Sequence, residues 1–249
     1  MHFHLPKPLH GWREFVGEVG IIVVGVLIAL GAEQVVEGIH DRNVADETRA
    51  SVRAELQTGL ASLALRQEAE PCIDRRLGEV RHLVDEWGRS GRFETPTWVA
   101  QAPRIGVTLS RYDSASAAGR LALLPSDEQF RLGLIATGLR GFGDTQAQEG
   151  LVWAKLRELQ SGPEALSPTD RTLVRAALQD AGTLDYNMRT LTGQILGLGA
   201  SDGLHPDYAA FRQRARLTWR SNRFSPSICS SIDTPPAVGN RNGVTPLPE

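Results

Sequence analysis

Residues that could act as catalysts or metal ligands are scattered along this chain of 249 residues rather than gathered in a motif. Gly138 to Gly143 is the one glycine-rich stretch. The residues before it have a helical pattern and no Gly-Lys-Ser/Thr follows, so a turn between two helices is expected instead of a phosphate loop. His2 and His4 form a His-x-His pair with no acidic or cysteine ligand close by, and His82 and His205 have no apparent nucleophile or base as a partner. The sequence therefore predicts no catalytic, cofactor-binding or metal-ligating residues.

The two cysteines, Cys72 and Cys229, lie far apart in the sequence. Neither belongs to a Cys-x-x-Cys motif or a Cys/His cluster, which disfavours a zinc site. In an oxidising compartment they could form a disulfide, and the chain-entropy estimate for closing so long a loop is about 4–5 kcal/mol. Two free thiols are an equally weighted alternative.

Charge and composition narrow the classes of protein further. The formal net charge is −2 and no long run of one sign occurs, so nucleic-acid binding has no electrostatic support. Hydrophobic residues make up 41% of the chain and charged residues 22%, which is ordinary for a globular protein. Aromatic residues are only 6%, and β-branched residues are sparse after the first forty positions, so the composition favours helices.

The clearest pattern is an uncharged run from Val19 to Ala32, bracketed by Glu18 and Glu33. As a helix this run would span about 21 Å, less than the ~30 Å hydrocarbon core of a bilayer. Apolar residues continue on both sides, and the longer segment 15–36 would span about 33 Å. We therefore expect a single transmembrane helix over residues 15–36, with the lipid bilayer as its partner.

Two alternatives stay open for this segment. In a cleaved signal peptide, Lys7 and Arg13 would form the basic region and Ala29-Leu30-Gly31 the cleavage site. In a soluble protein the segment would be a buried core helix, although a helix that is apolar on every face and adjoins a polar domain suits a membrane better.

Basic residues flank the segment on both sides, so the positive-inside rule favours neither orientation strongly. Lys7 and Arg13 precede it, and Arg42, Arg49 and Arg53 follow. A short basic tail is the usual arrangement of a signal anchor. We therefore expect residues 1–14 in the cytoplasm and the rest of the chain in the periplasm, with the anchor in the inner membrane of a bacterium.

One side of the expected membrane helix carries small and acidic residues: Glu18, Gly25, Ala29 and Ala32, spaced seven, four and three apart. Gly25 and Ala29 form a small-xxx-small pair, which allows the backbone of another helix to approach closely. This face is the predicted contact with other membrane proteins or with a second copy of the chain.

Beyond the anchor, apolar residues recur every three or four positions as far as about residue 222. This spacing predicts an all-α domain over residues 37–222, built as an antiparallel helical bundle. Residues 223–249 are rich in Pro, Ser, Asn and Gly and are expected to form an extended tail, tethered by Cys229. Pro71 is expected to end the first helix, and a short helix at 97–102, a short extended piece at 105–109 and a helix at 112–124 follow. Three further helices are expected to start at Ser126 with Gln129, at Thr145 with Gln148 and at Ser167 with Asp170. A last helix is expected from Pro206 to about Trp219.

The opening of the chain resembles a group of uncharacterised bacterial inner-membrane proteins. The similarity lies in His10 to Phe15 (HGWREF) and Gly17 to Gln34 (GEVGIIVVGVLIALGAEQ), and a weaker similarity covers Tyr112 to Pro125 (YDSASAAGRLALLP). The resemblance implies a topology, one N-terminal membrane helix followed by a helical domain of unknown function. It implies no activity and no site residues.

Three classes of function fit these patterns. The preferred hypothesis is a non-catalytic accessory, structural or scaffolding subunit of a larger membrane assembly, because an anchor with a small-residue face adjoins a domain without catalytic motifs. A periplasmic ligand-binding or sensing module is the alternative, and a pocket with converging polar groups would favour it. A membrane-anchored enzyme of unknown type is the least favoured, and a nucleophile–base pair within hydrogen-bond reach would revive it.

Overall fold

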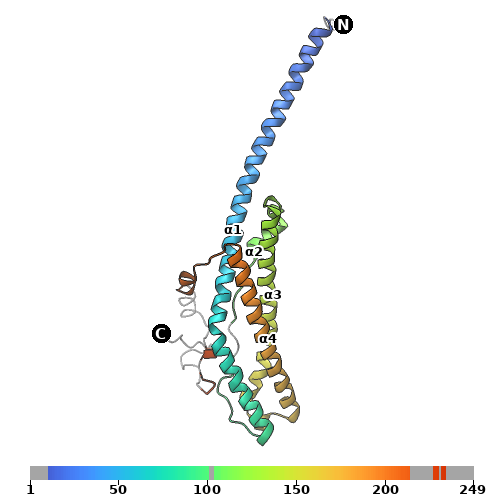
Figure 1. Cartoon of the computed structure of the whole chain (residues 1–249). Coiled ribbons are helices and arrows are strands. Elements are labelled where there is room, and N and C mark those ends of the chain that lie inside the picture. Colours follow the sequence, from blue (N-terminus) through green and yellow to red (C-terminus); the bar gives the residue numbers. More distant parts are fainter. Residues whose placement is uncertain (1–10, 101–103, 214–226, 230, 234–249) are drawn as a thin grey trace, which may run out of the picture.

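The computed structural model describes residues 11–100, 104–213, 227–229 and 231–233. Every regular element in these residues is a helix, so the predicted all-α fold is confirmed. The longest helix, α1 (Trp12–Ser90), rises above the rest of the molecule as a single rod, and its second half forms one wall of a helical bundle (Figure 1). At 1.5 Å per residue, its 79 residues span about 118 Å.

α1 runs through Pro71 without a break, so the prediction that this proline ends the first helix is wrong. A proline removes one helical hydrogen bond and crowds the preceding turn, at a cost of about 3 kcal/mol in a helix interior. Pro71 lies on the exposed side of the helix, while Leu65 and Ile73 on either side of it are buried in the bundle. Packing of the opposite face therefore holds the helix together across the proline.

Two further long helices complete the bundle. α3 (Ser126–Leu156) runs away from the projecting end of α1, and α4 (Pro168–Ser201) returns antiparallel to it, joined by the short turns η2 (Arg157–Ser161) and η3 (Pro163–Ala165) (Figure 1). α4 begins where the sequence predicted a helix start, and the structure forms a capping box there: Ser167 accepts a hydrogen bond from the Asp170 backbone, and Asp170 accepts one from the Ser167 backbone.

The glycine-rich stretch 138–143 lies inside α3, so the predicted turn at this point is wrong. A Cβ atom added at Gly138 would lie 2.7 Å from Ile195 Cγ1, which shows that this glycine lets α4 approach closely. Thr145 does not cap a new helix, because its hydroxyl donates to the carbonyl of Gly141 within the same helix. Close packing of α3 on α4 therefore outweighs the weak helix propensity of three glycines.

The chain between α1 and α3 returns to the end of the bundle from which the α1 rod projects (Figure 1). It forms α2 (Ser110–Ala117) and η1 (Arg120–Leu123), separated at Gly119, whose φ of 71° breaks the single helix predicted at 112–124. Residues 97–100 are not helical, contrary to prediction, and residues 101–103 lie outside the described residues.

α3 begins as predicted, but Ser126 makes no capping bond, and Gln129 donates to the carbonyl of Leu124 instead. Residues 208–213 are helical, and the rest of the predicted last helix lies outside the described part.

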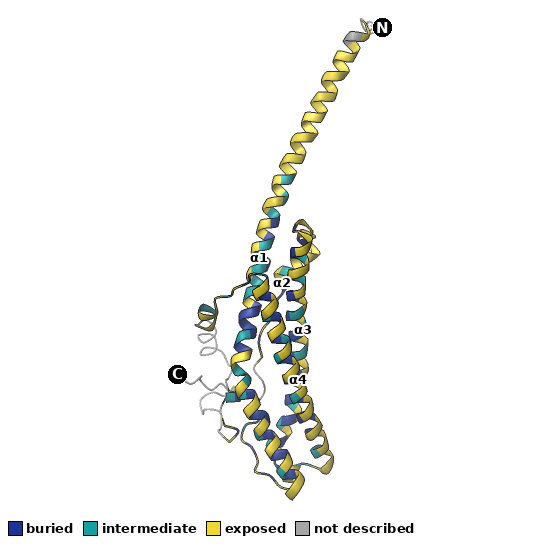
Figure 2. Cartoon of the chain, viewed as in Figure 1, coloured by how far each residue is buried: buried dark blue, intermediate teal, exposed yellow. Residues whose placement is uncertain are grey.

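Two apolar clusters form the core, one above the other along the bundle. The upper cluster, nearer the projecting rod, includes Leu56, Leu60, Leu139 and Ile195, and the lower cluster includes Trp153. Figure 2 shows buried positions along the facing sides of α1, α3 and α4, while the rod above them is exposed.

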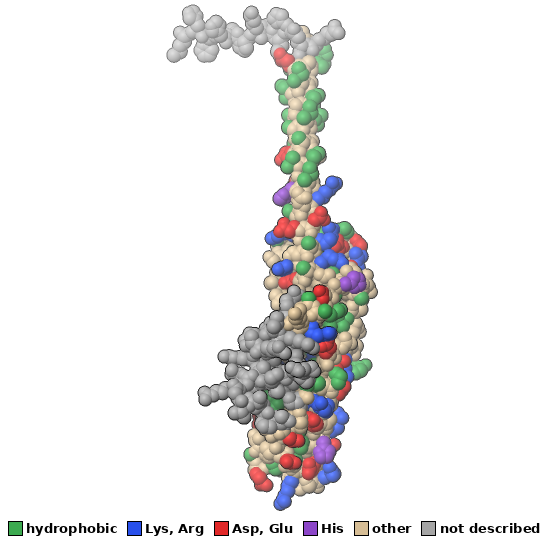
Figure 3. Space-filling model, turned by 90° about the vertical axis from the view of Figure 1, so that its left-hand side faces the viewer, with side chains coloured by type: hydrophobic (Ala, Val, Ile, Leu, Met, Phe, Trp, Pro, Cys, Tyr) green, Lys and Arg blue, Asp and Glu red, His purple; other side chains and the backbone are tan. Residues whose placement is uncertain are grey.

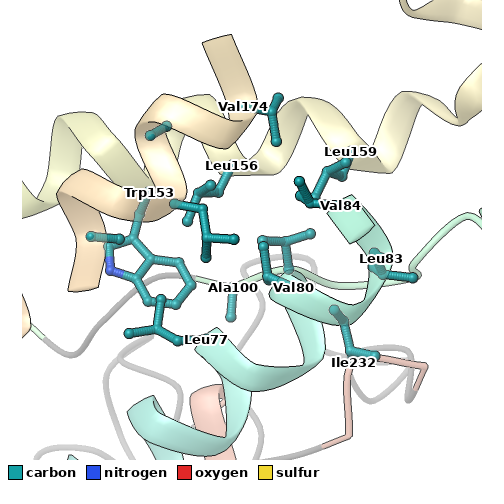
Figure 4. Close-up of a cluster of buried hydrophobic side chains, with 14 of the residues drawn as sticks. Leu77, Val80, Leu83, Val84, Ala100, Trp153, Leu156, Leu159, Val174 and Ile232 are labelled. Carbon is teal, nitrogen blue, oxygen red and sulfur yellow. The ribbon is translucent and has the colours of Figure 1, made fainter. Parts of the chain in front are cut away.

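Part of the C-terminal region packs against the lower cluster. Ile228, in the turn η4 (Ser227–Cys229), and Ile232 are buried there, and the Trp98 backbone donates a 2.9 Å hydrogen bond to the carbonyl of Ile232. Figure 4 shows Ile232 beside Leu83 of α1. The remainder of the predicted tail, 223–226, 230 and 234–249, lies outside the described residues.

Candidate functional site

The first candidate site is the rod formed by the N-terminal part of α1. The side chains from Phe15 to Glu37 are all exposed, and the first buried residue of the helix is Ala45. By length and composition this is a helix able to cross a membrane, near the N-terminus of the described chain. Figure 3 shows hydrophobic side chains around the rod and charged side chains over the bundle. The described part of the chain leaves this apolar surface uncovered, and exposed apolar patches are typical of sites that contact lipid or another protein.

The predicted packing face lies on this rod. Glu18, Gly25, Ala29 and Ala32 are all exposed on one side of α1, and beyond the adjacent turns of the helix itself no described atom lies within 4 Å of the Cβ position at Gly25. The bundle does not reach these residues, so no other described part of the chain occupies the face.

Cys72 and Cys229 meet in the structure. Their sulfur atoms are 2.09 Å apart and their Cα atoms 4.8 Å apart, across 157 positions of sequence. Arg75, on the same side of α1, donates a hydrogen bond to the Cys229 carbonyl. The disulfide therefore attaches the C-terminal region to the middle of the bundle.

A buried charge cluster, which no sequence motif announced, joins the three long helices. Arg66 of α1 donates from Nη2 to Glu149 Oε1 of α3 at 2.6 Å, and both side chains are only 2% exposed. Asp185 Oδ1 of α4 lies 3.5 Å from the same nitrogen. Arg189 of α4 bridges Asp185 Oδ2 at 2.7 Å and Asp74 of α1 at 2.5 Å. Three elements far apart in sequence thus contribute to one ionic network.

Burial dominates the electrostatics of this charge cluster. It raises the pKa of the Glu149 carboxyl above its ordinary value, because loss of water disfavours the charged form more than Arg66 and Trp153 favour it. Burial also raises the pKa of Asp185 against the attraction of Arg189, and that of Glu70 nearby. Burial therefore favours the protonated form of these carboxyls, and the ion pairs of the charge cluster link α1, α3 and α4.

The network is not fully satisfied. Arg66 Nη1 is buried without a hydrogen-bond partner among the described atoms, and Asp185 Oδ1 makes only the long contact to Arg66. Buried polar groups that lack part of their hydrogen bonds retain a desolvation cost. The charge cluster therefore adds little to the free energy of unfolding and instead favours one alignment of the helices over others. Its sequence signal was Arg66 itself, a charged residue three positions after buried Leu63 and seven before buried Ile73 on the same helical face.

Two sequence patterns have precedents at catalytic or metal sites, and neither forms such a site in the described residues. Gly199 to Gly203 (GASDG) matches a Gly-x-Ser-x-Gly elbow, but it ends α4 rather than linking a strand to a helix. Ser201 donates to the carbonyl of Gly197, and the Leu204 backbone donates to Gly199 across left-handed Gly203. Glu37 with His40 and Glu79 with His82 have Glu-x-x-His spacing. No group of three or more His, Cys, Asp or Glu that could hold a metal ion occurs in the described part of the chain.

Comparisons with known proteins returned no match among protein-family models, curated proteins or solved structures. The geometry of the chain is therefore the basis for assigning its function.

Proposed function

We propose that this chain is a single-pass protein of the bacterial inner membrane whose periplasmic helical domain serves as a non-catalytic accessory or scaffolding subunit of a larger membrane assembly. The observation that carries the proposal is the continuity of α1, which contains the apolar rod and also forms a wall of the bundle. No loop separates the two parts. A partner that packs on residues 15–36 would therefore hold the bundle at a set distance and direction from the bilayer.

The small-residue face supplies the proposed contact. Gly25 and Ala29 allow a second helix to approach the backbone, and Glu18 places a carboxyl on the same side. A carboxylate at that depth is costly unless it is neutral, reaches the headgroups or pairs with a partner. The resemblance of residues 10–34 to inner-membrane proteins belongs to the same proposal.

The disulfide supports the proposed orientation, because disulfides persist in the periplasm and are rare in the reducing cytosol. A C-terminal alkaline phosphatase fusion, which is active only outside the cytoplasm, is expected to be active. An inactive phosphatase together with an active cytoplasmic reporter at the same position would overturn the orientation.

Co-purification tests the assembly role. The full-length protein, extracted in a mild detergent, is expected to bring down one or more membrane proteins at constant ratio, identified by mass spectrometry, or to form a defined oligomer. A monomer in detergent that also yields no crosslinked product in native membranes would overturn the role.

Gly25→Leu sharpens this experiment, because it fills the predicted contact without changing charge or helix length. Gly20→Leu is the matched control, since Gly20 lies about 140° around the helix from Gly25. Co-purification is expected to fall with Gly25→Leu and to persist with Gly20→Leu. Equal effects of the two variants would argue against the predicted face.

A periplasmic sensing module is the second candidate, favoured by an open pocket of about 260 Å³ lined by residues of α1, α2 and η1. Its wall residues Glu47 and Ser51 lie on the same continuous helix as the apolar rod, so a bound ligand would touch the element that enters the membrane. A sensor would bind its signalling partner in a ligand-dependent way. A structural subunit would stay associated whether or not the ligand is present.

A further inference from the structure

The cavity at the membrane-proximal end of the bundle is lined by an unusual set of polar groups. α1 contributes Glu47, Thr48, Ser51 and Val52, α2 contributes Ser110, Arg111, Ser114 and Ala115, and η1 contributes Arg120. With a volume of about 260 Å³, it lies below the ~300–1,000 Å³ of most drug-sized ligand sites. The cavity therefore suits a small molecule or ion.

The two arginines of this cavity lack ionic partners. Arg49, Arg53, Arg131 and Arg140, at the same end of the bundle, each pair with an acidic side chain. Arg111 and Arg120 pair with none among the described residues. Because a guanidinium offers several donors in a planar fork, two of them at one cavity match a phosphate or a carboxylate.

The hydroxyl groups of the wall add further donors. Thr48 is only 5% exposed, and its hydroxyl makes no hydrogen bond to the described part of the chain. Ser51 and Ser114 are likewise without a side-chain hydrogen bond there. Ser110 differs, since its hydroxyl donates a hydrogen bond to Glu55 Oε1 at an oxygen–oxygen distance of 3.2 Å. Three hydroxyls thus remain to bind a ligand.

Two carboxylates, those of Glu47 and Glu55, lie at or beside the cavity. Glu55 accepts hydrogen bonds from the backbone of Arg111 at 3.0 Å and of Tyr112 at 2.9 Å, so it caps the start of α2. Glu47 is the one acidic side chain in the wall, against the two guanidiniums of Arg111 and Arg120. The lining residues themselves therefore carry two positive charges and one negative charge, and the Glu55 carboxylate beside them is engaged by the backbone at the start of α2.

We propose that this cavity, hereafter the α1–α2 cavity, binds a small soluble anion through a phosphate or carboxylate group held by Arg111, Arg120 and the three free hydroxyls. Glu47 lies eleven residues beyond Val36 on a continuous helix, or about 16 Å along its axis. The headgroup layer on each side of a bilayer is only about 5–8 Å thick. The α1–α2 cavity thus lies beyond the headgroups, which favours a solute over a lipid. This binding does not depend on the proposed assembly role.

Titration calorimetry of the full-length protein in nanodiscs, in phosphate-free buffer, tests the site with two probes, inorganic phosphate and succinate. We expect saturable binding of at least one probe with a Kd of ~1 mM or tighter. Absence of saturable binding of both probes in that range would overturn the proposal.

Paired variants locate the binding. Arg111→Gln/Arg120→Gln is expected to weaken it by about tenfold or more, through loss of charge-assisted hydrogen bonds. Arg81→Gln/Arg92→Gln, which removes two exposed arginines at the far end of the bundle, changes the net charge equally and is expected to leave the Kd within about twofold. Equal weakening by both pairs would mean non-specific attraction and would contradict the site.

Ser114→Phe tests the cavity without removing a charge, since Ser114 is exposed on its wall. Binding is expected to be lost while the circular dichroism melt stays that of the wild type. Retained binding in Ser114→Phe would overturn the location.

Nanodiscs of anionic lipid, compared with zwitterionic ones, distinguish the source of the anion. Equal Kd values support a soluble ligand, and abolished phosphate binding in anionic lipid would show a headgroup site instead.

Discussion

Arg66 of α1 and Glu149 of α3, which are 83 positions apart in the sequence, form a hydrogen-bonded ion pair with 2.6 Å between Nη2 and Oε1. Both side chains are only 2% exposed. The pair lies where the upper and lower apolar clusters adjoin, near Leu65 of one and Trp153 of the other. Sliding α1 along α3 by one turn would separate the two charges and leave both buried. The pair therefore specifies one alignment of the helices.

Arg66→Met is expected to lower the free energy of unfolding by about 3–5 kcal/mol, because Glu149 and Asp185 would stay buried without their shared cation. Urea unfolding of the full-length protein in detergent, followed by circular dichroism, measures the change. Arg140→Gln is the control, since the pair of Arg140 with Asp113 is about half exposed, and its loss is expected to cost less than ~1 kcal/mol. Equal effects of the two substitutions would contradict the role given to burial.

The pH dependence of stability follows from the raised pKa of Glu149. Its carboxyl binds a proton more tightly in the folded state than in the unfolded chain. This contribution is therefore fully present below the ordinary carboxyl pKa, about 4, and is lost as pH rises through the raised, folded-state value.

Glu149→Gln removes this titration. The unfolding free energy of the wild type minus that of the variant is expected to grow as the pH is lowered from 8 to 5, by at most about 1.4 kcal/mol per pH unit for one proton. Urea unfolding at a series of pH values gives the difference. A constant difference, or one that shrinks toward acid pH, would show that burial does not raise this pKa.

The disulfide is expected to stabilise the fold substantially. It closes a loop across 157 positions, for which the chain-entropy estimate is about 5 kcal/mol. Cys72→Ser/Cys229→Ser should lower the Tm and expose Ile228 and Ile232 to limited proteolysis. Dithiothreitol should lower the Tm of the wild type and leave that of the double variant unchanged. A double variant as stable as the oxidised wild type would mean that the C-terminal segment packs without the bond.

Gly199→Ala tests the close approach of α4 to α1. A Cβ atom at Gly199 would lie 2.5 Å from Leu60 Cδ1, so the Leu60 side chain must shift within the core or the helices must move apart, at an expected cost of about 1–3 kcal/mol. Gly193→Ala, on the exposed face of the same helix with nothing within 4 Å, is the matched control and is expected to stabilise by about 0.5–1 kcal/mol. Thermal unfolding is expected to show a lower Tm for Gly199→Ala and a higher Tm for Gly193→Ala. A higher Tm for both variants would contradict the close packing at Gly199.

Helix boundaries were predictable where a local interaction determines them. Ser167 and Asp170 satisfy each other's backbone within one turn, so their capping box is visible in the sequence and forms in the structure. Thr145 and Gln148 have comparable spacing and cap nothing, because the residues before them pack against α4 and stay helical. A local signal of about 1 kcal/mol does not prevail where tertiary burial opposes it.

By itself, the sequence determined the all-α class and the exposed apolar rod, since both depend on the order of apolar and polar residues along single helices. Only the tertiary structure decided that α1 continues through Pro71, that Arg66 meets Glu149 and Asp185, that Cys72 meets Cys229, and that Arg111 and Arg120 share one cavity. These features depend on how helices align in space. That alignment results from many side chains packing at once, so no local spacing reveals it.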